Sequence, residues 1–292
     1  MKIFVIDVGG TFIKYAVMNE QAEFFSRGKI PTPLDNRKNF FNAIKNLYEN
    51  FLVEGIAISM PGVIDSARGI CIKSSALNFN SGCNIVNELG EICKCPVTIE
   101  NDARCAALAE AKFGALADVD DGFVMVFGTM IGGAFIKNHE VHKGFNNAAG
   151  EISFVRKGGE IFSDNCSVPA LLKGYAQIKN LSTENVTGEN FFQAVNENEK
   201  DALTCLDRFT RRIAENIFNI QLIVDVPKFA IGGGISAQKI FIDSLKNNLK
   251  KVYEASPIEF NCVEVVPCKF LNDANLIGAL SNFLLRLNVD VH

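Results

Sequence analysis

The stretch FVIDVGGTFIKYAV, residues 4–17, constrains the fold of this chain more than any other part of the sequence. Two apolar runs flank a turn with an acid, two glycines and a hydroxyl, so the pattern predicts two buried strands joined by a tight turn. Glycine favours such a hairpin for steric reasons alone, and the turn needs no ligand on that account. A carboxylate that ends a buried strand, however, costs free energy unless it is paired or holds a cation. Asp7 therefore favours a turn that holds the phosphates of a nucleotide.

The residues of this first turn divide into donors and charges. The backbone amides of Gly9 and Gly10 and the hydroxyl of Thr11 can donate hydrogen bonds to phosphate, and Lys14 can add positive charge. Asp7 would act on Mg²⁺ through water or a phosphate, because Mg²⁺ keeps several waters and takes one or two carboxylates.

Strand and helix patterns alternate along the rest of the chain, which predicts an α/β fold. We expect strands near 22–29, 55–59, 96–100, 123–128, 134–137, 228–231 and 262–266, a hairpin over 63–73, and helices over 37–51, 84–93, 103–113, 168–180, 189–197, 199–223, 236–251 and 273–287. The segment FGTMIGG repeats the turn between two apolar strands, so two similar halves are expected, with a boundary in the polar stretch near 115–122.

Composition excludes several classes of protein. A chain of 292 residues with 48% hydrophobic residues and a net charge of −4 is typical of a soluble globular protein without a nucleic-acid partner. No apolar run reaches the ~18 residues of a membrane span, and the N-terminus does not resemble a signal peptide. The nine cysteines include no C-x-x-C pair, so we expect reduced core residues and a cytoplasmic protein. His139 and His142 fall at an apparent hairpin tip and are expected to be exposed.

Two further glycine-rich segments follow buried strands. The second hairpin turn, with Thr129, Gly132 and Gly133, would grip a triphosphate from the other side of a cleft, although a plain hairpin explains it as well. A triple glycine that contains Gly233 and Gly234 would let the backbone approach a flat ligand such as adenine, and loop flexibility is the alternative. No G-x-x-x-x-G-K-[ST] loop is present, and no G-x-G-x-x-G follows a strand.

Two acidic segments carry the remaining chemistry. Asn101 and Asp102 precede an alanine-rich helix, where capping alone explains both residues. In the functional alternative, Asp102 stays ionised at the helix N-terminus and accepts a proton from a sugar hydroxyl that attacks a γ-phosphate, while Asn101 binds a neighbouring hydroxyl. Glu151 is either a solvated loop acid or a carboxylate that accepts two sugar hydroxyls.

Seven segments in this order resemble the ROK family of sugar kinases and repressors, in the actin-like ATPase (hexokinase) superfamily. They are DVGGTFIKYAV (first phosphate motif), ISMPGVID (the next turn), IENDARCAALAEAKFG (catalytic-aspartate helix), GTMIGGAFI (second phosphate motif), GFNNAAGEIS (sugar segment), FAIGGGIS (adenosine motif) and NDANLIGAL (closing helix). The resemblance spans nearly the whole chain, and the motifs are specific jointly rather than singly.

The resemblance implies two ribonuclease-H-like lobes, with residues 1–117 as the N-terminal lobe, 118–272 as the C-terminal lobe, and helix 273–287 packed back onto the first. It implies phosphorylation of a hexose hydroxyl, O6 in the simplest case, by ATP and Mg²⁺, with Asp102 as general base. It places Asp7, Gly9, Gly10, Thr11, Lys14, Thr129, Gly132, Gly133, Gly233 and Gly234 at ATP, and Gly62, Asn78, Asn101, Asp102 and Glu151 at the sugar. The motif around Asn78 is the loosest, and a homodimer is compatible with the resemblance.

Departures from the family pattern affect the zinc site and the specificity. Family members with zinc follow the Gly-Glu motif with a histidine and a C-x-C-G-x-x-G-C run, whereas this chain has Phe154 at the histidine position and only Cys166 afterwards. One thiolate makes no tetrahedral site, so we expect no zinc and a resemblance to the zinc-free branch, which includes β-glucoside kinases. Glucose, a β-glucoside and N-acetylmannosamine all stay open as substrates. Met130 and Ala134 replace glycines, which would narrow the second turn or slow the enzyme.

Two other functions are alternatives to the kinase. A repressor of the family would carry an N-terminal helix-turn-helix, and we expect none because the first phosphate motif starts at residue 7. A catalytically weak sugar-binding or regulatory protein is the second rival, although every key acid is present. An ATP-coupled assay over a panel of sugars distinguishes it from a kinase.

Overall fold

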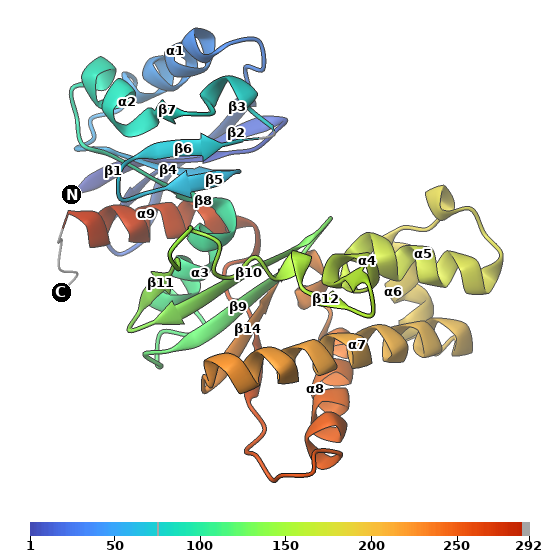
Figure 1. Cartoon of the computed structure of the whole chain (residues 1–292). Coiled ribbons are helices and arrows are strands. Elements are labelled where there is room, and N and C mark those ends of the chain that lie inside the picture. The colour runs from blue at the N-terminus through green and yellow to red at the C-terminus, as the bar shows by residue number, and fades with distance from the viewer. Residues whose placement is uncertain (75, 288–292) are drawn as a thin grey trace. The chain divides into compact units, whose positions relative to one another are not determined.

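The structure is a computed structural model that describes residues 1–74 and 76–287 (Figure 1). The chain forms two compact units, each with its own hydrophobic core. The first unit contains Met1–Lys112, Gly144–Asn147 and the described chain from Asn272 onward. The second unit contains Phe113–Lys143 and Ala148–Leu271.

A five-stranded sheet forms the centre of the first unit, in the order β3-β2-β1-β4-β8. Its strands are β1 (Lys2–Val8), β2 (Phe12–Asn19), β3 (Phe24–Pro31), β4 (Ile56–Met60) and β8 (Val97–Asn101). The first three strands are antiparallel neighbours, because tight turns join them, whereas β4 and β8 continue the sheet parallel to β1. Nearly every residue of β1 and β4 is buried, as expected where helices cover both faces of a sheet.

Helices cover both faces of this sheet (Figure 1). On one face, α1 (Arg37–Tyr48) and α2 (Ile85–Cys93) pack their apolar side chains against Phe4 and Ile6 of β1. On the other face lie α3 (Asp102–Phe113) and α9 (Ala274–Arg286). Helices α3 and α9 cross closely at Gly278, where an added Cβ would lie 1.6 Å from the Cys105 carbonyl oxygen, so this contact requires glycine.

A small three-stranded sheet also belongs to the first unit, in the order β5-β6-β7. Its strands are β5 (Val63–Asp65), β6 (Ile70–Lys73) and β7 (Cys83–Asn84), and the 3₁₀ helix Asn78–Asn80 lies in the connection between β6 and β7. Gly62, just before β5, has a φ of +128°, and a Cβ there would lie 2.4 Å from the Lys73 carbonyl oxygen. Close backbone packing therefore requires glycine at this position.

The sheet of the second unit repeats the strand pattern of the first, in the order β11-β10-β9-β14-β15. Its strands are β9 (Gly122–Phe127), β10 (Ile131–Lys137), β11 (Glu140–His142), β14 (Lys228–Gly232) and β15 (Glu264–Pro267). Here too an antiparallel hairpin is followed by two parallel strands. The predicted internal echo thus appears as two sheets with the same order and direction of strands.

Five helices complete the second unit. They are α4 (Phe162–Cys166), α5 (Val168–Lys179), α6 (Gly188–Asn196), α7 (Lys200–Val224) and α8 (Lys239–Glu254), together with a short hairpin of β12 (Arg156–Lys157) and β13 (Glu160–Ile161) and 3₁₀ helices at Ile152–Phe154, Thr183–Asn185, Gly234–Ala237 and Leu271–Asp273. The long helix α7 buries only one side, which includes Ile213 and Ile217. None of the helices in the described residues combines the length and the apolar character that a membrane crossing requires.

Two expectations about single residues can be compared directly with the structure. His139 and His142 are exposed at the β10–β11 hairpin, as predicted, and His139 Nε2 lies 2.9 Å from Asp120 Oδ1. All nine cysteines are free thiols, five of them buried.

The helix predicted over 236–251 instead begins at Lys239, because Gly234–Ala237 forms a 3₁₀ helix first.

Candidate active site

The carboxyl ends of three parallel strands bring the first group of predicted site residues together. In register, Asp7 of β1 lies opposite Ser59 of β4, and the next residue, Met60, lies opposite Asn101 of β8. The chain leaves β8 at Asn101 and enters α3 at Asp102. Ligands of open α/β sheets bind outside the carboxyl ends of the strands, so this edge is the candidate site of the first unit.

Asp7 is held by two side chains that the sequence analysis did not assign. Ser59 Oγ donates to Asp7 Oδ1 at 3.0 Å, and Asn275 Nδ2 of α9 donates to the same oxygen at 3.1 Å. The other oxygen, Oδ2, lies 3.8 Å from Lys14 Nζ. Asp7 is 8% exposed. Neutral donors on one oxygen and a half-exposed lysine near the other compensate the buried charge without a tight ion pair.

Asn101 and Asp102 form a linked pair at the start of α3. Asn101 Oδ1 accepts the Arg104 amide at 3.2 Å, which is the capping role considered from the sequence. Asn101 Nδ2 donates to the Gly62 carbonyl at 3.0 Å and to Asp102 Oδ1 at 2.9 Å. Asp102 Oδ1 also accepts the Ala103 amide at 2.9 Å. Within the described residues nothing donates to Oδ2 of Asp102, so this oxygen is the one available to a ligand.

The environment of Asp102 opposes its ionisation. Burial is the largest effect and raises the pKa of this carboxyl, and the nearby charge of Asp7 raises it further. The hydrogen bonds from Ala103 and Asn101 act in the opposite direction without outweighing burial. For the prediction that Asp102 stays ionised at the helix N-terminus, burial therefore acts against ionisation and the N-terminal hydrogen bonds act in its favour.

A buried ion pair lies directly behind this pair. Arg104 Nη1 is 3.7 Å from Glu100 Oε1, and both side chains are almost completely buried. Glu100 Oε1 also accepts the Asn101 amide at 2.9 Å, while Arg104 Nη2 donates to the Asn147 carbonyl. The pair thus fixes the backbone at Asn101 and ties the segment Gly144–Asn147 to the first unit.

The first glycine turn is only partly free to bind an anion. The Gly9 amide donates to the Phe12 carbonyl at 2.9 Å, so it serves the hairpin itself. Thr32, which the sequence analysis did not assign, braces the turn, because its Oγ1 donates to the Gly9 carbonyl at 2.7 Å and its amide to the Thr11 carbonyl at 3.0 Å. Gly10 and Thr11 are exposed, and an added Cβ at Gly10 would meet nothing within 4 Å. Gly10 and the Thr11 hydroxyl remain the better phosphate candidates.

The second glycine turn is held by serines within the second unit. The Ile131 amide donates to Ser153 Oγ at 3.1 Å and to Ser163 Oγ at 3.2 Å, and Ser153 Oγ donates to the Ile131 carbonyl at 2.6 Å. The Val168 amide, at the start of α5, donates to the Gly128 carbonyl at 3.1 Å. Thr129 stays exposed at the tip of this braced turn.

The remaining glycines of the second unit have packing reasons of their own. A Cβ on Gly133 would lie 2.6 Å from the Gly150 carbonyl oxygen, so the chain at Gly150 passes directly over β10. A Cβ on Gly233, which has a φ of +89°, would lie 2.0 Å from the Phe127 carbonyl oxygen. Gly132 pairs with Val126 in the sheet, and Gly234 has open space around it. The triple glycine therefore has a steric function in addition to any role at adenine.

Of the predicted sugar contacts, Glu151 and Asn78 are the two with exposed side chains. Glu151 precedes the 3₁₀ helix Ile152–Phe154, and its side chain is exposed in the second unit. Asn78 is also exposed, and its side chain makes no hydrogen bond to another described residue. The structure thus groups Asp7, Asn101 and Asp102 by direct or linked contacts, whereas Asn78 has no link to them.

The acids that are present suit a magnesium–phosphate complex and not a protein-built metal cage. Across the described part of the chain, no group of three or more His, Cys, Asp or Glu side chains could hold a metal ion. A single carboxylate such as Asp7 fits Mg²⁺, which binds through one or two carboxylates together with substrate phosphates. Burial raises the pKa of Cys166 to about 12, which disfavours the thiolate that zinc requires.

Comparison with known proteins places the chain in a family. The family model described as the ROK family matches residues 3–285. The chain belongs to the ROK family. It is 29% identical to a β-glucoside kinase from Listeria monocytogenes, over 99% of both chains. The predicted membership is thereby confirmed.

Solved structures agree with this assignment. A ROK family protein from Streptococcus pneumoniae, solved in complex with sucrose, has a TM-score of 0.91 at 26% identity, and the match covers 99% of both chains. A putative N-acetylmannosamine kinase from Listeria monocytogenes has a TM-score of 0.87 at 28% identity, over 99% of this chain and 100% of that one. The predicted fold class, that of the actin-like ATPase superfamily, is confirmed, and sugar kinase is the activity that the names of the two Listeria relatives give.

Proposed function

We propose that this ROK protein transfers the γ-phosphoryl group of ATP to a hydroxyl of a hexose or hexose-derived sugar, O6 in the simplest case. The observation that carries the proposal is the state of Asp102. Its Oδ1 is fixed by two hydrogen bonds, its Oδ2 accepts none from the described residues, and burial raises its pKa. A carboxylate of raised pKa with one unengaged oxygen is suited to accept a proton from a hydroxyl.

The proposed mechanism gives Asp102 a positioning role and a late proton-accepting role. Phosphoryl transfer places most of its demand on alignment and on charge stabilisation. Asn101 orients Asp102 and binds a neighbouring sugar hydroxyl, and Asp102 Oδ2 receives the hydroxyl proton as the oxygen bonds to phosphorus. Mg²⁺, when bound near Asp7, supplies neutralisation of phosphate charge. Ser59 and Asn275 hold Asp7 in the orientation that this requires.

The other assignments belong to the same proposal. We assign the two units to the predicted lobes, with ATP contacts from Gly10, Thr11, Lys14 and Thr129 and a weaker case for Gly9, whose amide is already engaged. The remaining assigned contacts are Gly132, Gly133, Gly233 and Gly234 at ATP and Gly62, Asn78 and Glu151 at the sugar. A zinc-free, cytoplasmic enzyme, monomeric or homodimeric, completes the proposal.

The substrate is proposed from the relatives' names. β-Glucoside kinase is the first choice because of the 29% identical relative over 99% of the chain. The putative N-acetylmannosamine kinase at 28% identity supports the alternative. A catalytically weak sugar-binding protein is the remaining candidate, and the exposed Met130 in the second turn is the observation that favours it.

A sugar panel tests the proposal. The purified chain is assayed for ADP release with Mg·ATP and glucose, cellobiose, N-acetylglucosamine or N-acetylmannosamine. We expect sugar-dependent turnover with at least one of them, and its loss in Asp102→Asn. Sugar binding without ADP release by the wild-type chain would favour the regulatory alternative, and turnover unchanged in Asp102→Asn would reject the assigned base.

A further inference from the structure

A hollow opens in the second unit between α5 and α7, with α4 at its end. It encloses about 460 Å³, and its lining includes Asn165, Lys173, Gln177, Arg208 and Arg212. This volume lies within the range of small-molecule sites. Both arginines are exposed, so the α5–α7 hollow is accessible from solvent.

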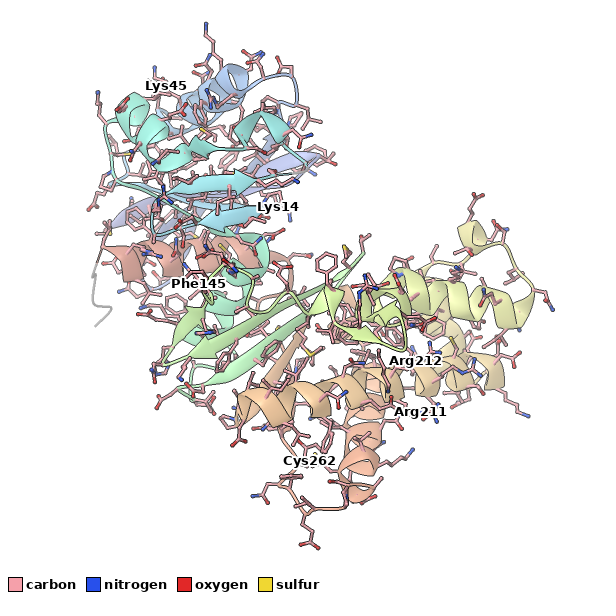
Figure 2. The ribbon with its side chains drawn as sticks, viewed as in Figure 1. Lys14, Lys45, Phe145, Arg211, Arg212 and Cys262 are labelled. Atoms are coloured by element: carbon pink, nitrogen blue, oxygen red, sulfur yellow. The ribbon has the colours of Figure 1, made fainter. Side chains whose placement is uncertain are left out.

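The arginines lie on one side of α7. Arg208 and Arg212 are four residues apart, which puts them on the same face of the helix. Thr210, on a different face, meets α8 through a 2.8 Å contact between its Oγ1 and Ser244 Oγ. Figure 2 shows Arg211 and Arg212 on α7, and Arg211 lines an adjoining hollow of about 270 Å³ that shares Arg212. The arginines of α7 thus line two adjacent hollows, and the smaller one also contains the acids Glu160 and Glu215.

The charges that line the α5–α7 hollow do not balance. Lys173, Arg208 and Arg212 face a single acid, Asp164, although the chain as a whole has a net charge of −4. Neither Arg208 nor Lys173 forms an ion pair or a side-chain hydrogen bond with another described residue. Arg212 has only a long bond, 3.5 Å from Nη1 to Asn165 Oδ1. Like charges that line one hollow repel one another, and a bound anion would lower that repulsion.

The buried thiol of Cys205, in the lining of the same hollow, responds to both arginines. Burial raises the pKa of Cys205, and the positive charges of Arg208 and Arg212 oppose that rise. The two guanidinium groups thus act together on one point in the wall of the hollow.

We propose that the α5–α7 hollow binds a small phosphorylated sugar. Arginine presents a rigid fork of donors that matches phosphate oxygens, so Arg208 and Arg212 would hold the phosphate group, with added charge from Lys173. The Gln177 side-chain amide offers a donor and an acceptor to sugar hydroxyls, while Asn165 Nδ2 already donates to Glu160 Oε2 at 2.6 Å and keeps one further N–H for a ligand. The amide N–H groups can also donate to phosphate oxygens, but the amide carbonyl oxygens need a donor, so the pair suits a ligand that carries hydroxyls as well as charge. Binding here requires no catalysis at Asp102.

Calorimetric titration of the full chain tests the site. The probes are glucose 6-phosphate and inorganic phosphate, at low ionic strength because screening weakens exposed charges. We expect the double variant Arg208→Gln/Arg212→Gln to weaken glucose 6-phosphate binding by about tenfold or more, as loss of charge-assisted hydrogen bonds implies. The matched control is Lys246→Gln/Lys250→Gln, which removes the same charge from exposed positions of α8 and should retain wild-type affinity.

Hydrogen exchange locates the binding, because a phosphate ester can also occupy the proposed catalytic site. Glucose 6-phosphate should slow exchange in α5 and in residues 205–216 of the wild-type chain, and this protection should vanish in the arginine variant. Equal affinity for the two probes would overturn the assignment to a phosphorylated sugar. No protection in these segments, or equal weakening in the lysine control, would overturn the site itself. Neither readout uses turnover, so an absent kinase activity would leave this result interpretable.

Discussion

The two units place different chemistry on the same arrangement of strands. In the first unit, Asp7 is the next-to-last residue of β1 and β8 leads into Asp102, and neutral side chains orient both carboxylates. In the second unit, the corresponding hairpin strand β9 ends in Phe127, and the turn is held by serine hydroxyls. One topology thus carries buried acids at the strand ends of one unit and a turn held by hydroxyls in the other. The difference teaches that the strand pattern alone does not carry the chemistry.

The largest expected effect is on the charged edge. Asp102→Asn keeps the shape and the Oδ1 hydrogen bonds but removes the proton acceptor, so kcat should fall by about 10²–10⁴-fold while sugar affinity stays near wild type. Steady-state kinetics and calorimetric titration of the sugar check this. A comparable loss of kcat in an exposed variant such as Asp35→Asn would show that the effect is not specific to Asp102.

Replacement of Asp7 should come next in size. Asp7→Asn removes the carboxylate proposed to act on Mg²⁺, and kcat/KM should fall by about 10²-fold. Burial, and then the charge of Asp7, raises the pKa of Asp102, so loss of that charge should lower it. Because Asp102 must be ionised, activity declines as pH falls through its pKa, and this acid limb should move to lower pH in the variant. An acid limb at the same pH in the variant and the wild type would mean that Asp102 does not set this limb, or that the charge of Asp7 does not affect it.

For the second unit we expect substitutions of glycine to change thermal stability. Gly233→Ala places a Cβ 2.0 Å from the Phe127 carbonyl oxygen at a φ of +89°, so the melting temperature should fall by about 5 °C or more. Gly234→Ala is the matched control, because a Cβ there meets nothing within 4 Å, and it should change the melting temperature by less than about 2 °C. Equal shifts in both variants would contradict the steric reason for the glycine.

The smallest expected effect is a gain in thermal stability when an acid of the first unit is replaced. Because the pKa of Asp102 is raised in the folded state, the protonated side chain favours folding at pH values below the pKa of the unfolded chain. This contribution to the free energy of unfolding is lost as pH rises through the pKa of the folded state. Asp102→Asn should therefore raise the melting temperature at neutral pH by about 2 °C, and the gain should shrink in acid. A lower melting temperature at every pH would mean that the carboxylate is favoured by its surroundings.

Much of the fold could be predicted because its strands and helices have strong local patterns. The Gly-Gly hairpin, the strand that ends at Asn101 and the amphipathic helix α7 are all visible in the spacing of apolar residues. The hairpin Arg156–Ile161 and the five-residue helix α4 have no such spacing, because short elements depend on tertiary contacts. The α8 start was misplaced by three residues because a single turn is too short for its apolar spacing to distinguish a 3₁₀ helix from an α-helix.

The site was predicted where a motif carries its own chemistry, and missed where a residue acts through another. Asp7, Asn101 and Asp102 stand out as acids and amides at strand ends. Ser59 is one polar atom in an apolar strand, and Asn275 is 268 positions from its partner in the chain. Only the folded chain brings them to Asp7. A polar residue at the carboxyl end of β4 was the one available signal for Ser59.

The position of α9 has a consequence for synthesis. This helix covers one face of the first sheet, yet it is encoded at the far end of the chain, after the whole second unit. On the ribosome, the β1, β4 and β8 surface that α9 covers remains without that cover until Ala274–Arg286 has emerged. A nascent chain that stalls in α8 would present an apolar sheet surface to chaperones, and Asp7 would still lack its hydrogen bond from Asn275.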